Sequence, residues 1–113
     1  MFFFSASEPA APGAERITVS TSRGNFRLPL TAIDFVRADH VYVNFHLAER
    51  KRLVQRTSLA AIEEQLPADK FLRVRRSFIV NLDRIVYWTT DTIMIGEYRI
   101  PISRKRRKAV LAL

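Results

Sequence analysis

Cysteine is absent from the 113 residues of this chain. Disulfide bonds, thiolate nucleophiles, and zinc or iron–sulfur sites held by cysteine are therefore excluded. Glycine is almost as scarce, since Gly13, Gly24 and Gly96 are the only three and stand apart from one another. The chain thus has no glycine-rich loop of the kind that cradles nucleotide phosphates, and we expect no bound cofactor.

Long apolar runs are also missing. The longest contain only a few residues, whereas a membrane-spanning helix needs roughly 20. The opening residues Met1–Phe4 lack the charged region and the long apolar core of a signal peptide. We therefore expect a cytoplasmic protein. The same four residues would also suit the end of a membrane segment removed from a longer, membrane-anchored parent protein, and this alternative stays open.

Patterns typical of catalytic and metal sites are missing as well. Ser77 has no histidine near it in sequence, and the acidic residues show no paired arrangement. We therefore predict that the protein is not an enzyme. The only histidines, His40 and His46, would lie about 20 Å apart along one extended strand, too far to bind one metal ion. We expect no metal site, and we expect His46 to be structural or exposed.

Positive charge is what the chain has in excess. It contains 19 lysines and arginines against 11 aspartates and glutamates, a formal net charge of +8. Glu8 and Glu15 are the only charged residues among the first fifteen, so residues 16–113 hold all 19 cations and only 9 acids. Such an excess on a small surface favours a polyanionic partner: nucleic acid, anionic lipid or an acidic protein.

One folded domain is expected, because a chain of this length is too short for two independent cores. Residues 1–15 are rich in alanine, proline and serine without apolar periodicity. They are predicted to be a flexible tail or linker. Residues 16–113 are predicted to form the domain.

Alternation of apolar and polar residues in this domain predicts a mainly β fold. We expect a hairpin from residues 17–20 and 26–30, with Pro29 at a sheet edge. Further strands are expected over residues 41–47, 52–56, 77–81, 85–88, 92–95 and 98–101.

Two helices complete the expected fold. A short amphipathic helix is capped by Thr57 or Ser58 and stopped by Pro67, and its apolar face carries Leu59, Ile62 and Leu66. Residues 103–113 are predicted to form a C-terminal helix capped by Ser103.

Eight of the nineteen cations occupy two short segments, residues 73–76 and 104–108. The second segment would open the C-terminal helix, where the helix dipole disfavours positive charge. A bound phosphate would reverse that penalty, whereas the alternative is a solvated basic tail. From the two segments and the serines beside them we select candidates for contacting phosphate: Arg73, Arg75, Ser77, Ser103, Lys105, Arg107 and Lys108.

The arginines of residues 73–76 have two interpretations. An arginine can bind guanine O6 and N7 through two hydrogen bonds, or can bind a phosphate with both arms of its guanidinium. The alternative is surface pairing with Glu63, Asp69 or Asp83. The spacing of these arginines in the sequence does not distinguish contact with DNA from pairing with an acidic residue at the surface.

The order of several segments resembles the LytTR family of bacterial DNA-binding domains. The segments are Ile33–Val36, His40–Val43, Arg56–Leu59, Phe71–Asn81 and Ile100–Arg104. The resemblance covers about residues 16–113. It implies an elongated, mostly antiparallel β fold of small sheets that inserts loops into successive major grooves of DNA. Family members are usually output domains of transcription regulators.

Carried over residue by residue, the family's base-contacting positions correspond to His40, Arg76 and Arg104. The chain departs from the family at Arg75, where histidine is common. The resemblance also implies an upstream receiver, sensor or membrane domain in a longer parent protein, and a stand-alone regulator is the open alternative. A homodimer on repeated half-sites is a further expectation.

Two other functions stay open. The first is an RNA-binding basic domain that stacks bases on Tyr42, Tyr87, Trp88 or Tyr98. The second is docking on an anionic membrane through the C-terminal helix, whose apolar residues are Val110, Leu111 and Leu113.

Overall fold

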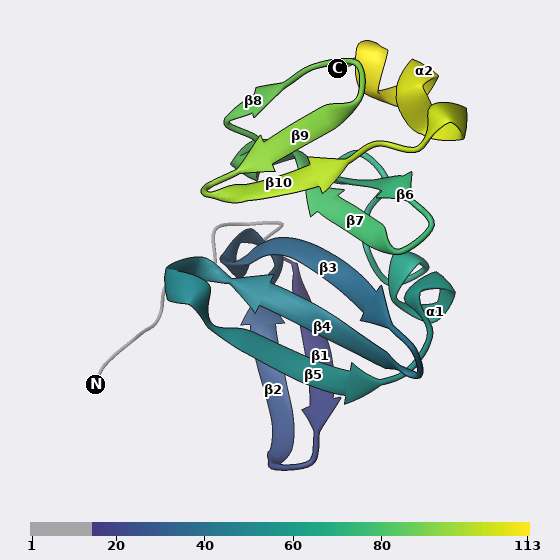
Figure 1. Ribbon diagram of the computed structural model, residues 1–113. Coiled ribbons are helices and arrows are strands. Elements are labelled where there is room, and N and C mark those ends of the chain that lie inside the picture. Colours follow the sequence, from purple (N-terminus) through teal and green to yellow (C-terminus); the bar gives the residue numbers. More distant parts are fainter. Residues whose placement is uncertain (1–14) are drawn as a thin grey trace.

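Short antiparallel strands make up most of the computed structural model, which describes residues 15–113 (Figure 1). The strands are β1 (Arg16–Thr21), β2 (Gly24–Pro29), β3 (Ile33–Asp39), β4 (Tyr42–Leu47), β5 (Arg52–Arg56), β6 (Phe71–Arg75), β7 (Phe78–Asn81), β8 (Tyr87–Trp88), β9 (Thr92–Ile95) and β10 (Tyr98–Pro101). The helices are α1 (Leu59–Glu63) and α2 (Arg107–Leu111), with 3-10 turns η1 (Leu30–Ala32), η2 (Ala48–Arg50), η3 (Leu82–Arg84) and η4 (Arg104–Arg106).

The strands form three sheets. β1 and β2 make a hairpin, β8 to β10 make a three-stranded sheet, and the central sheet has the order β5-β4-β3-β7-β6. β3 lies in the middle of the central sheet, pairing with β4 on one side and β7 on the other. The described part of the chain measures 44 × 30 × 25 Å. The elongated, mainly β fold that the resemblance implied is therefore confirmed.

Two apolar cores lie on opposite faces of the central sheet. Val36 and Phe45 belong to the first core, which α1 and the hairpin of β1 and β2 help to enclose. Phe35 points the other way and belongs to the second core, with Ile93 of β9 and Val110 of α2. Because neighbouring residues of a strand face opposite sides, one strand can supply both cores.

Several predicted elements are confirmed. The first hairpin forms, and Pro29 lies on its outer strand opposite Arg16. The hydroxyl oxygen of Ser58 caps α1 by accepting a hydrogen bond from the N–H of Ala61 at 3.1 Å. Leu59, Ile62 and Leu66 are buried as expected, but α1 ends at Glu63, before the predicted stop at Pro67, and Leu66 lies in the turn that follows.

The strands β3 and β6 were not among the predicted strands. Both carry a register irregularity, between Ile33 and Phe35 in β3 and between Arg73 and Arg75 in β6. An extra residue in a strand shifts all later side chains to the opposite face. The regular alternation that identifies a strand in a sequence is therefore interrupted in both. The predicted strand over residues 85–88 is shorter than expected, since only Tyr87 and Trp88 form β8.

The predicted C-terminal helix capped by Ser103 was wrong in its first part. The Ser103 side chain makes no capping hydrogen bond, and residues 104–106 form a 3-10 turn before α2 begins at Arg107. The turn positions Arg106, whose guanidinium donates a hydrogen bond to the carbonyl oxygen of Arg73 at 3.2 Å. Because α2 has five residues, the helix-dipole argument for phosphate at this segment loses its basis.

Most of the predicted tail, including Met1–Phe4, lies outside the described residues. Glu15, its last residue, is described, and its carbonyl oxygen accepts a hydrogen bond from the N–H of Leu30 at 3.0 Å. The boundary of the domain at residue 16 stays a prediction.

Candidate nucleic-acid interface

His40 lies at the tip of the two-residue turn between β3 and β4. Asp39 and Tyr42 face each other at the ends of the two strands, so His40 and Val41 form the turn. The φ angle of His40 is 57°, in the left-handed region that residues other than glycine seldom adopt. Its side chain is 91% exposed, and the nearest charged partner is the Asp39 carboxylate, 3.8 Å from Nε2. The turn therefore presents the imidazole to solvent.

Arg76 lies in a second two-residue turn, between β6 and β7. Arg75 faces Phe78 across the strand pair, and Arg76 and Ser77 join them. The strand irregularity at Val74 comes immediately before this turn, and Val74 is fully buried. An irregularity of this kind re-aims the side chains that follow it. The guanidinium-bearing side chains of Arg75 and Arg76 are exposed as a result.

The two turns are held side by side through β3 and β7. The N–H of Ala38 donates a hydrogen bond to the carbonyl oxygen of Ser77 at 2.8 Å. A hollow lies between the turns, and we name it the His40 hollow; its walls include His40, Ser58, Arg75, Arg76 and Ser77. The structure thus brings the first two predicted base-reading residues to one depression.

Arg104 reaches the same region from the end of the chain. The N–H of Ser103 donates a hydrogen bond to the carbonyl oxygen of Val74 at 2.9 Å, which fixes the start of η4 beside β6. A second hollow, here named the Arg104 hollow, is lined by Arg73, Arg75, Arg76, Ser103, Arg104, Lys105 and Arg106. Both hollows are lined by Arg73, Arg75 and Arg76, so the end of β6 and the turn after it form the ridge between them.

We use the name basic face for the surface formed by these groups: His40, Arg75, Arg76, Ser77, Ser103, Arg104 and Lys105. In Figure 1 it follows the right-hand side of the molecule, where the turn after β3, the turn after β6 and the segment after β10 all lie. Arg75, Arg76, Arg104 and Lys105 are exposed, and none has a carboxylate within 4.0 Å among residues 15–113. Their charges are available to an anionic partner.

Arg73 differs from the other predicted phosphate contacts. Its side chain is only 19% exposed, and its Nη1 lies 3.0 Å from a carboxylate oxygen of Glu63. Its Nη2 donates a hydrogen bond to the carbonyl oxygen of Arg76 at 2.6 Å. Of the surface pairings considered for this segment, the one with Glu63 therefore forms.

Arg107 and Lys108 are not brought into either hollow. Arg107 is half-buried in the first turn of α2, and its Nε is buried without a hydrogen-bond partner among residues 15–113. Lys108 is exposed. These two residues lie beside the basic face rather than within its hollows.

Two contributions were missed from the sequence. Ser58 lines the His40 hollow, although its hydroxyl was recognised only as a helix cap. Arg106 was counted only within a basic run, yet it is half-buried and bonded to Arg73. The cap motif was a usable signal that Ser58 begins a helix, but nothing local in the sequence shows which turn that helix adjoins.

His46 is half-buried and lies far along β4 from the His40 turn. Its ring stacks on Phe35 with the ring centres 4.2 Å apart, and the edge of Tyr98 meets it at 5.6 Å. Burial, together with the nearby positive charges of Arg52 and Arg37, lowers the pKa of His46 to about 4. The expectation of a structural role fits this packing. Residues 15–113 contain no group of three His, Asp or Glu side chains that could hold a metal ion.

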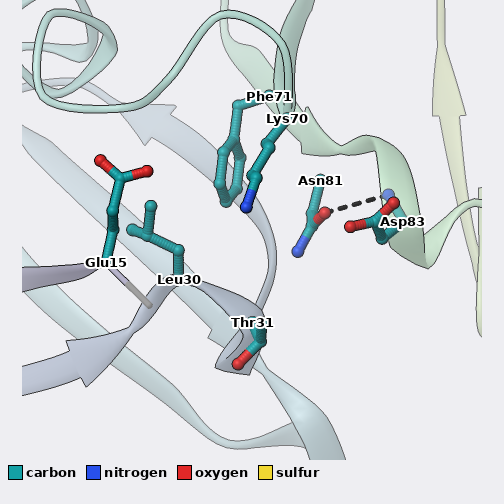
Figure 2. A pocket seen from close by; sticks show the side chains of 7 residues that line it. All are labelled: Glu15, Leu30, Thr31, Lys70, Phe71, Asn81 and Asp83. Carbon is teal, nitrogen blue, oxygen red and sulfur yellow. Dashed lines mark hydrogen bonds between the residues drawn. The ribbon is translucent and has the colours of Figure 1, made fainter. Parts of the chain in front are cut away.

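A separate hollow opens at the opposite end of β6 and β7. Figure 2 shows its lining side chains, which include Glu15, Lys70, Asn81 and Asp83. The side-chain oxygen of Asn81 accepts a hydrogen bond from the N–H of Asp83 at 3.0 Å. Two carboxylates line this hollow and only one cation, so it does not suit a polyanion.

The aromatic and apolar residues considered for other functions are dispersed. Tyr98 packs against Phe35 with the ring centres 5.0 Å apart, while Tyr87 and Trp88 are exposed on β8 and line neither hollow. Val110 is fully buried in the second core, so of the three apolar residues considered for membrane docking only Leu111, in α2, and Leu113, after it, are exposed. Within the described part of the chain, no helix is long and apolar enough to cross a membrane.

Two comparisons with known proteins point to one family. The family model described as the LytTr DNA-binding domain matches residues 23–113. A similar solved structure is the LytTr DNA-binding domain of a protein described as a methyl-accepting/DNA response regulator from Bacillus cereus. The identity is 25%, the TM-score is 0.73, and the match covers 88% of this chain and 96% of that chain. A comparison with curated protein sequences gives no match.

Proposed function

The chain belongs to the LytTR family of DNA-binding domains, and from this premise we propose that His40, Arg76 and Arg104 read base pairs. As a member of this family, it binds double-stranded DNA sequence-specifically in transcription regulation. The observation that carries the proposal is the basic face, where all three side chains are exposed along two adjoining hollows.

Each proposed reader has donors that suit base edges in a groove. An arginine can donate two hydrogen bonds to O6 and N7 of guanine, and each such pair is worth about 1–3 kcal/mol of discrimination. A histidine at the tip of a narrow turn can reach a base edge that a flat sheet would not. The left-handed φ of His40 fits this role, because strained backbone is often kept where a side chain must project.

The phosphate contacts flank the readers on the same surface. Arg75 and Ser77 adjoin Arg76, and Ser103 and Lys105 adjoin Arg104. Contacts to phosphate position a protein on the duplex, while contacts to bases specify the sequence. Arg107 and Lys108, outside the hollows, would add general attraction to the duplex.

We also propose that a second copy of the chain is a partner on DNA. The 44 Å length of the domain exceeds the roughly 34 Å of one turn of DNA, so one chain can cover one half-site. Two chains on repeated half-sites would then form a dimer on DNA. An upstream sensor, receiver or membrane domain remains a prediction from the resemblance. A cytoplasmic location and a role in binding rather than catalysis also stay predictions, made from the missing signal-peptide and catalytic patterns of the sequence.

Selecting bound fragments from random duplex DNA, followed by substitution of the readers, tests the proposal. Arg76→Ala and Arg104→Ala should each weaken binding to the selected site by about 1–3 kcal/mol and change binding to random duplexes much less. Lys108→Ala is the matched control and should weaken both equally. Equal losses on selected and random DNA for Arg76→Ala and Arg104→Ala would show that they contact phosphates rather than bases.

A further inference from the structure

Both reading segments of the basic face are attached to the same two residues of β6. The Arg73 side chain holds the carbonyl oxygen of Arg76 at 2.6 Å, and the Arg73 carbonyl oxygen accepts a hydrogen bond from Arg106 at 3.2 Å. The next carbonyl oxygen, that of Val74, accepts a hydrogen bond from the N–H of Ser103 at 2.9 Å. The turn that carries Arg76 and the segment that carries Arg104 therefore share one anchor.

The anchor itself is rigid. Val74 is fully buried in the second core, so its main chain has little freedom to move. The Arg73 guanidinium is held between α1 and the turn, because Glu63 binds Nη1 while the Arg76 carbonyl oxygen binds Nη2. A planar guanidinium with two fixed partners loses little further freedom and holds both in one geometry.

The same contacts leave Arg73 with little charge to offer DNA. Its carboxylate partner Glu63 compensates the positive charge, and its side chain is largely covered. Arg75, the next arginine along the chain, has neither restriction, since it is exposed and has no acid within 4.0 Å among residues 15–113. Arg73 and Arg75, two residues apart, therefore differ in the charge that they can offer to DNA.

We propose that Arg73 and Arg106 are positioning residues that fix the distance between Arg76 and Arg104, and that Arg73 does not contact DNA. The inference rests on the proposed function, because it assumes that Arg76 and Arg104 read bases. Arg73 holds the turn against β6, and Arg106 holds the C-terminal segment against the same strand. The protein then discriminates not only which bases are present but also the spacing between the two groups of bases that it reads.

The shared anchor should make binding sensitive to the number of base pairs between the two groups of bases that the protein reads. Base readout tolerates displacements of well under 1 Å before hydrogen bonds fail. If the two segments moved independently, a site with one base pair inserted between the two contacted groups could still be read. With both segments on one anchor, that site should be rejected.

The first test uses the free protein. Arg73→Lys keeps the charge but cannot bind Glu63 and the Arg76 carbonyl oxygen in the same forked geometry. Hydrogen exchange at the Ala38 amide, which donates to Ser77, should then accelerate by at least about tenfold. The Ser103 amide, bonded to the Val74 carbonyl oxygen, should keep its rate. Arg75→Lys is the matched control and should alter neither amide.

The second test measures spacing. Duplexes selected by the parent chain are compared with versions that gain or lose one base pair between the two contacted groups. Arg73→Lys and Arg106→Lys should each reduce the preference for the original spacing by about tenfold or more. Arg27→Lys is the control and should preserve the preference, because Arg27 is exposed on β2 and lines neither hollow. Glu63→Gln is a milder variant that keeps the shape of the site and should move the preference in the same direction.

The third test separates positioning from contact. Arg75→Gln should make the slope of log affinity against log salt shallower by about 0.9, the value for one lost phosphate contact. Arg73→Gln should leave the slope unchanged. A shallower slope for Arg73→Gln, or unchanged spacing preference in both positioning variants, would overturn the inference. If no duplex is selected at all, the proposed function fails, while unchanged exchange at Ala38 in Arg73→Lys overturns the anchor on its own.

Discussion

Ala38 and Ser77 are joined by a main-chain hydrogen bond of 2.8 Å, from the N–H of Ala38 to the carbonyl oxygen of Ser77. This bond lies at the ends of β3 and β7, between the turn that carries His40 and the turn that carries Arg76. Ala38 and Ser77 are 39 positions apart in the sequence, and this bond makes the two turns neighbours on one surface. The basic face depends on such bonds, because its members come from three separate parts of the chain.

Binding to duplex DNA should depend steeply on salt concentration. If the exposed cations neutralise about 5–8 phosphates, log affinity should fall with log salt with a slope of about −5 to −7, because each contact releases bound counterions. Fluorescence anisotropy of a labelled duplex at several salt concentrations measures the slope. A slope near zero would contradict an interface made by the unpaired arginines and lysines.

Replacing His40 by glycine should separate stability from DNA readout. Glycine adopts a φ of 57° without strain, so His40→Gly should leave the free energy of unfolding unchanged or raise it by up to about 1 kcal/mol. Affinity for the selected site should fall by about 1–3 kcal/mol. Denaturant unfolding and anisotropy titrations measure the two effects.

Glu49→Gly is the matched control for that substitution. Glu49 is also exposed and has a φ of 63°, but it lies in η2, at the far end of β4 from the His40 turn. Glu49→Gly should change the free energy of unfolding as His40→Gly does, because glycine relieves the same left-handed backbone. It should not change the ratio of affinities for selected and random DNA. A lower ratio in both variants would mean that the loss comes from overall destabilisation rather than from the imidazole.

The stability of the fold should decrease below neutral pH because of His46. Its pKa is lowered to about 4 by burial and by the positive charges of Arg52 and Arg37, whereas a histidine in an unfolded chain has a pKa of about 6.5. The unfolded state therefore binds the proton more tightly. The contribution of neutral His46 is fully present above about pH 6.5 and is lost as the pH falls toward 4.

Denaturant unfolding at pH 7 and pH 5 checks this behaviour. His46→Phe keeps an aromatic ring against Phe35 and removes the titrating group, so its stability should change less between the two pH values. An equal loss in the parent chain and in His46→Phe would assign the effect to other groups.

Asn81 should matter for stability and not for DNA recognition. It is 4% exposed, donates a hydrogen bond to the Ile33 carbonyl oxygen at 2.8 Å, and accepts one from the Asp83 N–H. Asn81→Ala leaves buried groups without partners and should cost about 1–3 kcal/mol. The exposed residue Asn25 is the control, since Asn25→Ala should stay within about 0.5 kcal/mol.

The specific-to-random affinity ratio of folded Asn81→Ala should match that of the parent chain, because Asn81 lies at the end of β7 away from the Arg76 turn. Thermal unfolding and anisotropy measure stability and affinity separately. A changed affinity ratio would show that a substitution at the Asn81 end of β6 and β7 alters the basic face.

The sequence could identify the elements whose signals are local. The hairpin of β1 and β2 was recognisable from alternation and a polar turn, and α1 from the Ser58 cap and the apolar positions that follow it. β3 and β6 were not recognisable in this way, since irregularities at Ile33–Phe35 and Arg73–Arg75 interrupt the period of two. The C-terminal helix was misjudged because helix propensity does not include the bond between Arg106 and Arg73.

The amino-acid sequence alone determined the class of partner and the candidate readers. An excess of cations, two basic segments and the order of the family segments are properties of the chain itself, and all three proposed readers, His40, Arg76 and Arg104, were named from them. The tertiary structure decided how the arginines divide their tasks. Arg73, Arg75 and Arg76 are near neighbours in sequence, but Glu63 and the Arg76 carbonyl oxygen engage the first, whereas the other two face solvent. The physical reason is that a guanidinium's role depends on the partners that folding brings within hydrogen-bonding distance, and residues far away in the chain supply those partners.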